Sequence, residues 1–194
     1  MRPNVALIGR ARSGKDTVAA HLTAQPYNYY RLAFADDLKA AALKADPIIP
    51  YDLPGFGGLQ HVRLSTLVEH IGWERAKDEY PEVRRTLQHF GQGIRDLDED
   101  FWLNLVLRKV DGAARLNIPV VVSDVRYANE ANELRARGFT LVRIKRVSVT
   151  GRFLPGENGT HRSETALDDY PANHTLVNGG TVAELHAQVD DLVA

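Results

Sequence analysis

The sequence predicts a three-layer α/β/α fold with a mainly parallel central sheet, and three observations carry this prediction. The apolar run Val5–Ile8 is followed at once by a glycine-rich turn and a helix-forming stretch. Residues 118–122 are apolar throughout, as expected of a strand buried on both faces of a parallel sheet. Strand-like and helix-like segments then alternate along the chain, which is typical of layered α/β proteins.

The first half of the chain opens with a strand over 4–8 and a helix that begins near Lys15. A short second strand is predicted over 31–34, before a helix over 37–45. Residues 46–60 are rich in proline and glycine and predict a long loop. Thr66 and Glu69 have the spacing of a capping box at the front of a short helix.

The second half continues the alternation. Helices are predicted over 82–92, 99–116 and 128–137, and strands over 118–122, 140–145 and 174–177. Thr181 and Glu184 form a second capping box, at the start of a terminal amphipathic helix. Residues 147–163 are polar, contain glycine and predict a loop.

Composition limits the classes of protein to consider. At 194 residues the chain has room for one domain with a sizeable core. The formal net charge is −1, so a global basic surface for nucleic acid is not expected. The chain has no cysteine and no apolar run of membrane-spanning length, and its first core strand is predicted close to residue 1. We therefore expect a cytoplasmic protein without a membrane partner.

Residues 9–17 read Gly-Arg-Ala-Arg-Ser-Gly-Lys-Asp-Thr and have the pattern of a phosphate-binding P-loop between a strand and a helix. The glycines let backbone N–H groups curve around an anion, and the helix directs its positive dipole end to the same place. Lys15 supplies a mobile charge for the β- and γ-phosphates. The loop residues predicted to bind ATP are Gly9, Arg12, Ser13, Gly14, Lys15, Asp16 and Thr17.

This loop departs from the common form directly after its lysine. Asp16 stands where Ser or Thr is usual, and the hydroxyl follows at Thr17. Both residues could bind Mg²⁺, in part through water; alternatively, Thr17 could bond a phosphate oxygen and Asp16 could fix the loop. Asp124 comes shortly after the run 118–122, at the strand end where open parallel sheets bind ligands. It is the second predicted anchor for Mg²⁺-nucleotide, and Arg126 would reach the same crevice.

Further segments, spread in order through nearly the whole chain, match one family. They are residues 14–17, 34–39, Leu87-Gln88 with Gly91 and Arg95, 123–126 with Asn129-Glu130, His161 with Ser163-Glu164, and 177–181. Together they resemble the bacteriophage deoxynucleoside monophosphate kinases. That resemblance implies a P-loop kinase fold with a lid insertion, and transfer of the ATP γ-phosphate to a deoxynucleoside monophosphate (dNMP) with Mg²⁺. Dimers occur among similar kinases.

The resemblance also implies roles for single residues. Those implied to bind the acceptor are Lys39, Arg84 and Arg95 at its α-phosphate, Gln88 at a base edge, and Trp102 or Tyr127 against the base or sugar. Core packing is the other interpretation of Trp102. Arg126 would bridge the donor and the acceptor. We expect residues 46–100 to form a helical insertion for the acceptor.

The remaining roles concern the lid and the adenine. Residues 147–163 would be a lid, with a plain surface loop as the alternative. The lid would bring Arg146 or Arg152 to the transferring phosphoryl group. Asn178 and Gly179 would lie beside the adenine of ATP.

Three other functions fit parts of the sequence. The chain also resembles the animal-type phosphomevalonate kinases, in its Gly-Lys-Asp, Lys39, Arg84, Arg95 and the Asp124-x-Arg126 pair. A GTPase-type switch has only residues 52–55 in its favour, and no Asn-Lys-x-Asp motif for guanine occurs. A P-loop ATPase or assembly subunit is the third alternative, and both the small size and the lack of basic character speak against it.

Overall fold

The computed structural model describes residues 2–52, 58–147 and 165–194, which form two compact units. The first unit is Met1–Phe34 with Leu105–Ala194, and the second is Ala35–Asn104. In chain order the elements are β1 (Val5–Ile8), α1 (Lys15–Thr23), β2 (Tyr30–Leu32), α2 (Phe34–Ala45), β3 (Ile48–Asp52), β4 (Leu59–Arg63), α3 (Leu64–Glu79), α4 (Pro81–Leu97), α5 (Phe101–Arg115), β5 (Val120–Val125), α6 (Ala128–Ala136), β6 (Thr140–Arg146), β7 (His174–Asn178) and α8 (Val182–Val193).

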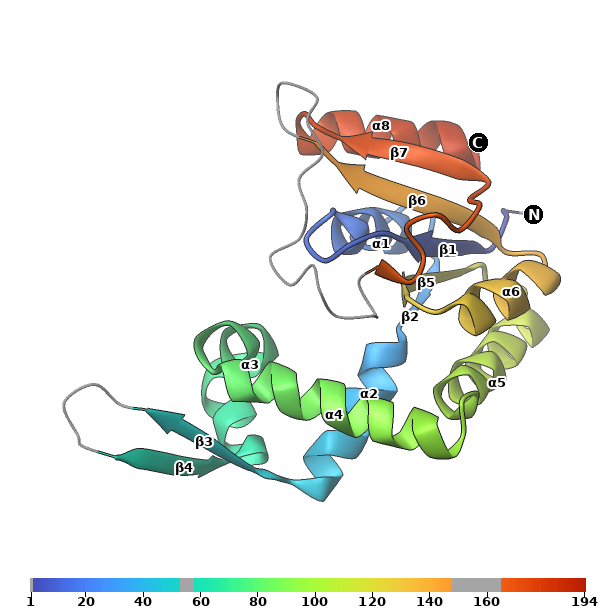
Figure 1. Ribbon diagram of the computed structural model, residues 1–194. Coiled ribbons are helices and arrows are strands. Elements are labelled where there is room, and N and C mark those ends of the chain that lie inside the picture. The colour runs from blue at the N-terminus through green and yellow to red at the C-terminus, as the bar shows by residue number, and fades with distance from the viewer. Residues whose placement is uncertain (1, 53–57, 148–164) are drawn as a thin grey trace. The chain divides into compact units, whose positions relative to one another are not determined.

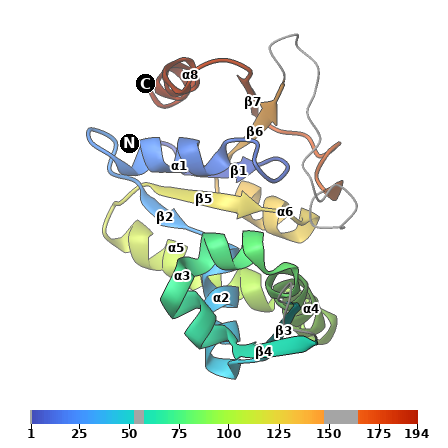
Figure 2. The same cartoon turned by 90° about the vertical axis from the view of Figure 1, so that its left-hand side faces the viewer.

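A five-stranded parallel sheet in the order β2-β5-β1-β6-β7 forms the centre of the first unit (Figure 1). Helices α1 and α8 pack against each other and cover one face, while α5 and α6 cover the other (Figure 2). The connections from β1 to β2 and from β5 to β6 run in opposite directions across the sheet. Because such crossovers are right-handed, the helices within them lie on opposite faces. The predicted three-layer α/β/α fold is confirmed.

Burial on both faces explains why the strands of this sheet are continuous apolar runs. Every residue of β1 is buried, and so are the first four residues of β5. The core joins these strands to one face of α1 and of α8, and each fully buried Leu or Ile stabilises the fold by roughly 1.5–3 kcal/mol. Because β1 and α1 pack in the same core, the turn between them is fixed at both ends.

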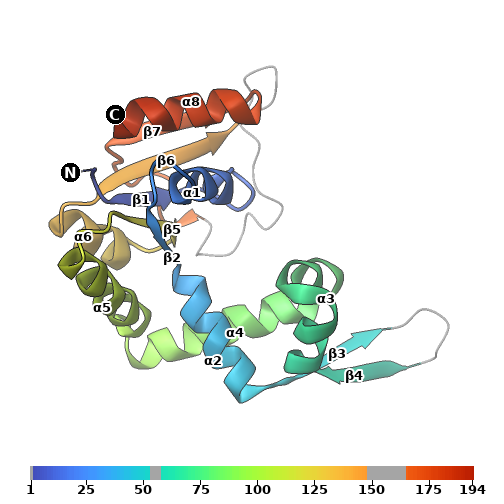
Figure 3. The same cartoon turned by 180° about the vertical axis from the view of Figure 1, so that it is seen from behind.

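The second unit consists of α2, α3 and α4 with an antiparallel hairpin of β3 and β4 (Figure 3). It has a core of its own, in which Ala42 of α2 and Ile49 of β3 meet apolar residues of α3 and α4. Helix α3 is interrupted at Gly72, whose φ of 76° lies outside the helical range. Helix α4 extends to Leu97, beyond the predicted range of 82–92.

The hairpin shows that the predicted loop over 46–60 was wrong. Ile48–Asp52 pairs with Leu59–Arg63, and Pro50 lies opposite His61. Both strands of a two-stranded sheet are edge strands, where a proline is tolerated because its missing N–H interrupts no central ladder. Ile49 is fully buried while Ile48 is exposed. Both isoleucines are apolar, so the sequence did not show which of them would be buried, and the proline and glycine content predicted a loop.

The predicted capping box at Thr66 and Glu69 was also wrong, because α3 begins earlier, at Leu64. A distant residue caps its first turn instead. Asp46 Oδ1 accepts the backbone N–H of Ser65 at 2.9 Å, and this bond lowers the pKa of the Asp46 carboxyl. A cap that comes from before the hairpin leaves no local sequence signature.

The second predicted capping box is confirmed at the start of α8. Thr181 Oγ1 accepts the N–H of Glu184 at 3.2 Å, and the Glu184 carboxylate accepts the N–H of Thr181 at 2.8 Å. Two backbone N–H groups of this helix end are thus satisfied by side chains within one turn, which is why local spacing was sufficient to predict the capping box.

Candidate functional site

The carboxyl ends of the parallel strands meet at one edge of the first unit's sheet, where the glycine-rich loop follows β1 (Figure 1). Because β1 lies between β5 and β6, the ends of these two strands flank the loop. Ligands of open parallel sheets bind at this edge. The predicted site residues that the structure brings to it are Gly9, Arg12, Ser13, Gly14, Lys15, Asp16, Thr17, Asp124, Arg126, Arg146, Asn178 and Gly179.

The loop between β1 and α1 needs glycine at two positions. Gly9 has a φ of 142°, and a Cβ placed on it would lie 2.5 Å from the carbonyl oxygen of Ile144. Gly14 has a φ of 107°, and its Cβ would lie 2.5 Å from Nδ2 of Asn178. Arg12 is also left-handed, with a φ of 59°. Left-handed residues turn successive peptide groups toward a common centre, as in anion-binding loops.

Two polar side chains of this loop and the start of α1 are buried. Lys15 is only 7% exposed, and its Nζ donates to the carbonyl oxygens of Gly9 and Arg10, each at 2.7 Å. Ser13 is 3% exposed, and among the described residues its Oγ is the one buried side-chain polar atom without a hydrogen-bond partner. Buried polar groups are normally bonded, so this hydroxyl at the N-terminus of α1 indicates a ligand that bonds to it.

Two side chains from the neighbouring strand ends hold the outer side of the loop. Arg146 Nη1 donates to the carbonyl oxygen of Arg12 at 3.1 Å, and Asn178 Nδ2 donates to that of Ser13 at 2.9 Å. In a trans peptide the C=O and the following N–H point in opposite directions. The bond from Asn178 therefore turns the N–H of Gly14 away from β7. Gly179 follows β7 directly.

Arg143 of β6 has a structural role. It is 8% exposed and donates to the carbonyl oxygens of Leu167, at 2.9 Å, and Tyr170. Burial lowers the pKa of its guanidinium. Arg10 of the loop pairs with Asp168 of the same segment, with Nε 3.2 Å from Oδ1. Sequence reasoning assigned no role to Arg10, because nothing local predicts this partner.

Asp124 lies within β5, one residue before its end, rather than beyond the strand as predicted. Its Oδ1 accepts the backbone N–H of Phe34 at 2.8 Å, and its side chain is half-buried. Arg126 follows the strand and is half-buried too. Asp16 and Thr17 lie in the first turn of α1, where a carboxylate interacts favourably with the helix dipole. Side-chain oxygens that can ligate a metal ion thus lie on two sides of the loop, from Asp16 and Thr17 on α1 and from Asp124 on β5.

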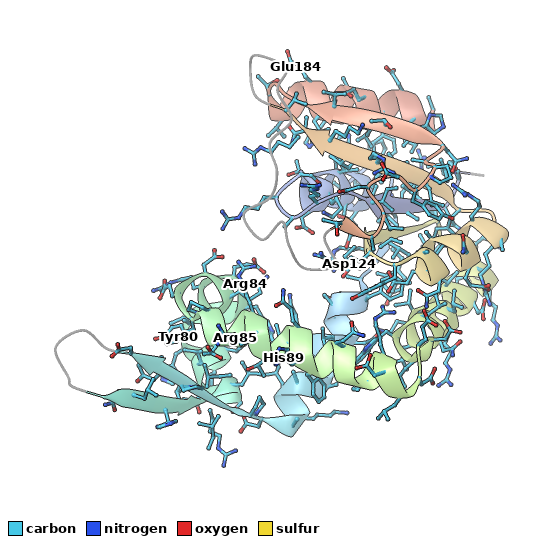
Figure 4. All side chains as sticks on the ribbon, viewed as in Figure 1. Tyr80, Arg84, Arg85, His89, Asp124 and Glu184 are labelled. Carbon is cyan, nitrogen blue, oxygen red and sulfur yellow. The ribbon has the colours of Figure 1, made fainter. Side chains whose placement is uncertain are left out.

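In the second unit, three predicted acceptor residues share one face of α4. Arg84, Gln88 and Arg95 lie within about 40° of one another around a helix that turns 100° per residue. The predicted helix over 82–92 excluded Arg95, and the longer observed helix includes it. Arg84 is labelled in Figure 4, with Arg85 and His89 on the same helix.

Arg84 and Arg95 also make contacts within their own unit. Arg84 Nε donates to the carbonyl oxygen of Lys77 at 2.8 Å, and its guanidinium pairs with Asp78. Arg95 Nη1 donates to the carbonyl oxygen of Glu99 at 3.3 Å. These contacts orient both guanidinium groups within the second unit.

Two tryptophans of this unit differ in environment. The Lys39 ammonium lies over the ring of Trp73, 5.5 Å from its centroid. Sequence reasoning gave no role to Trp73. Trp102 is 3% exposed, and its indole N–H donates to the carbonyl oxygen of Gly91 at 3.2 Å. Core packing is therefore the correct interpretation of Trp102, and the predicted stacking on an acceptor does not fit so buried a ring.

Arg152 and the predicted lid over 147–163, except Val147, lie outside the described residues. Within the ranges that the structure describes, no helix is both long and apolar enough to cross a bilayer.

Comparisons with known proteins identify relatives of this chain. A family model described as deoxynucleotide monophosphate kinase matches residues 58–189, well over half of the chain. A protein of Acanthamoeba polyphaga mimivirus, provisionally named a deoxynucleotide monophosphate kinase, is 25% identical over 95% of this chain and 93% of its own length. The uncharacterized protein ORF77 of ictalurid herpesvirus 1 is 34% identical over 57% of this chain, which spans only 48% of that protein.

A solved structure was also found by comparison of folds. It is the crystal structure of TT1252 from Thermus thermophilus, with a TM-score of 0.48, 17% sequence identity, and coverage of 99% of this chain and 97% of its own.

Proposed function

The chain belongs to the deoxynucleotide monophosphate kinase family, and on that premise we propose that it transfers the γ-phosphate of ATP to a dNMP, giving a dNDP and ADP. The observation that carries the proposal is the loop after β1. It combines a left-handed backbone, a buried lysine and a buried, unbonded serine hydroxyl at the start of α1.

The donor phosphates would bind along this loop. Backbone N–H groups and the positive end of α1 favour an anion there, and Lys15 adds a full charge. On binding, the Lys15 ammonium would exchange its bonds to the carbonyl oxygens of Gly9 and Arg10 for phosphate oxygens. Ser13 Oγ would then gain the partner that it lacks in the described structure.

The residues near the loop fit Mg²⁺, which prefers oxygen ligands and is usually held by one or two carboxylates together with substrate phosphates and water. Asp16, Thr17 and Asp124 supply such oxygens at the sheet edge. Among the described residues, no three acidic or histidine side chains form a cluster that could hold a metal ion. Bound Mg²⁺ would neutralise charge on the donor phosphates.

The acceptor side of the proposal is carried by Lys39, Arg84 and Arg95, which would neutralise its α-phosphate, and by Gln88, which would bond a base edge. Arg126 would bridge donor and acceptor, with Arg146 and Arg152 as the other cations near the transferring group. The acceptor phosphate is already ionised at neutral pH, so no general base is needed. Positioning and electrostatic stabilisation would then supply most of the rate.

An acceptor panel tests this function. ADP release is measured with ATP–Mg²⁺ and each of dTMP, dGMP, dCMP and dAMP, their ribose forms, phosphomevalonate, and no acceptor. We expect ADP release that depends on at least one dNMP. Release that depends only on phosphomevalonate would replace the acceptor class, and equal release without any acceptor would indicate an ATPase.

A further inference from the structure

Glu130 is a buried carboxylate to which the proposed mechanism assigns no role. It lies in the first turn of α6, five residues after the end of β5, and is 1% exposed. A carboxylate is almost never fully buried unless strong hydrogen bonds compensate its lost hydration. Its contacts therefore show what the buried charge holds in place.

Two of those contacts are with backbone N–H groups of the turn that carries Arg126. Glu130 Oε2 accepts the N–H of Arg126 at 2.8 Å and the N–H of Tyr127 at 3.1 Å. Two consecutive N–H groups directed at one oxygen fix the orientation of two planar peptide groups. The backbone at Arg126, from which its side chain departs, is thereby held by a buried charge.

The strand that enters this turn is irregular. Ala6 of β1 lies opposite Val122, but Ile8 lies opposite Val125, so β5 contains one extra residue between these pairs. Such bulges re-aim side chains and recur next to active sites. Asp124 lies in the bulged stretch and accepts the Phe34 N–H. The bulge, this bond and the Glu130 bonds together fix the course of the chain from residue 123 to 127.

We propose that Glu130 is a positioning residue that fixes the backbone of Arg126 and so aims its guanidinium at the phosphates of the bound nucleotide. The inference rests on the proposed function, from which the role of Arg126 comes. A guanidinium binds phosphate through a planar fork whose direction matters, so a small displacement of its backbone weakens the interaction. A residue that only caps α6 would stabilise the helix without acting through Arg126.

A double-mutant cycle separates these two roles. The variants are Glu130→Ala, Arg126→Ala and the double variant, each measured for kcat and for melting temperature. We expect Glu130→Ala to lower kcat about tenfold or more in the wild-type background, but less than about twofold when Arg126 is already Ala. Equal losses in both backgrounds would mean that Glu130 does not act through Arg126 and would overturn the proposal.

Two further variants keep the test decisive. Glu130→Gln should retain most of kcat, because its amide oxygen can accept the same two N–H groups. Glu133→Ala is the matched control, since Glu133 lies on the same helix, is partly exposed and pairs with Arg137; it should have wild-type kcat. If Glu130→Ala does not fold, Glu130→Asp takes its place in the cycle, because its shorter side chain draws the carboxylate away from the turn.

The same cycle on ADP affinity, measured by calorimetry without acceptor, distinguishes failure of this inference from failure of the proposed function. If no dNMP supports transfer, the proposed function fails, and ADP affinity still decides the role of Glu130. Loss of affinity in Glu130→Ala that disappears in the Arg126→Ala background supports the inference. Additive losses, or an Arg126→Ala variant with wild-type kcat and ADP affinity, would overturn it.

Discussion

The two units of this molecule place their predicted site residues in different ways. In the first unit, the candidate site is built mainly from the main chain, with left-handed backbone at Gly9 and Gly14 and the N-terminus of α1. Arg146 and Asn178 hold this loop by bonds to its carbonyl oxygens. In the second, the site consists of side chains on helix faces, and Arg84 there already pairs with Asp78. We therefore expect that one substitution in the backbone-built donor site abolishes most of its function. In the acceptor site, each substitution should weaken acceptor binding only in part.

The largest expected effect is that of Lys15→Ala, which removes the only buried ammonium among the described residues at the loop. We expect kcat to fall by about 10²–10³-fold, because the proposed mechanism assigns to Lys15 a charge that stabilises the transferring phosphoryl group. The measurement is dNMP-dependent ADP release, with circular dichroism as the check on folding. Lys145→Ala is the matched control, since Lys145 is exposed on β6 and should not matter. Near-wild-type turnover of Lys15→Ala would remove Lys15 from the mechanism.

Gly9→Ala should have the next largest effect, since its Cβ would lie 2.5 Å from the carbonyl oxygen of Ile144. The left-handed φ adds strain, so we expect the KM for ATP to rise about 100-fold and the melting temperature to fall by about 5–10 °C. Gly93→Ala in α4 is the contrasting variant, because a Cβ there meets nothing within 4 Å and alanine favours a helix. Equal effects of the two variants would refute the special status of the loop backbone.

Arg84→Ala should weaken the acceptor side by one step. We expect the KM for the dNMP to rise about tenfold while the KM for ATP stays within about twofold, because only one of several cations is lost. Arg85→Ala is the matched control on the same helix, where Arg85 is 62% exposed and pairs with Glu82. A rise in the KM for ATP instead would show that Arg84 belongs to the donor side.

The smallest expected effect concerns pH, and it also separates the units. Burial and the neighbouring His21 lower the pKa of His186 from 6.5, against an opposing effect of Asp190. The unfolded chain therefore binds more protons as the pH falls below 6.5, so stability of the first unit is lost on acidification. In the second unit, the pKa values of Asp46 and Glu74 are lowered from 3.8 and 4.5, so that contribution is lost only at lower pH.

Thermal unfolding at pH 7 and pH 5.5 measures this effect. We expect the wild type to lose a few degrees more in melting temperature than His186→Gln, which cannot titrate in this range. The hydrogen bond from Tyr27 to Asp190, near His21 and His186, does not involve the substituted residue. Identical losses in the two proteins would show that His186 contributes nothing to the acid sensitivity.

Much of the first unit was predictable because its determinants are local. A buried parallel strand is a run of apolar residues, and the P-loop is a contiguous pattern whose function lies in the backbone. The capping box of Thr181 and Glu184 was predictable for the same reason. Asp124 and Arg126 were placed at the correct sheet edge because strand ends of a parallel sheet share one side.

The features that sequence reasoning missed depend on partners far away in the chain. Asp46 caps α3 from before the hairpin, and Asp168 pairs with Arg10 across the sheet edge. Glu130 was recognised only as part of a resemblance, since nothing in its spacing shows that it is fully buried beneath Arg126. Burial of Trp102 likewise depends on tertiary packing.

The fate of the γ-phosphate tests the central claim most directly. The protein is incubated with ATP labelled at the γ-position, Mg²⁺ and the dNMP that best supports ADP release, and the labelled products are separated. We predict that the label appears in dNDP in a one-to-one ratio with ADP formed, because under the proposed function the loop holds a donor for transfer rather than for hydrolysis. Label released as inorganic phosphate, with no labelled dNDP, would contradict the account.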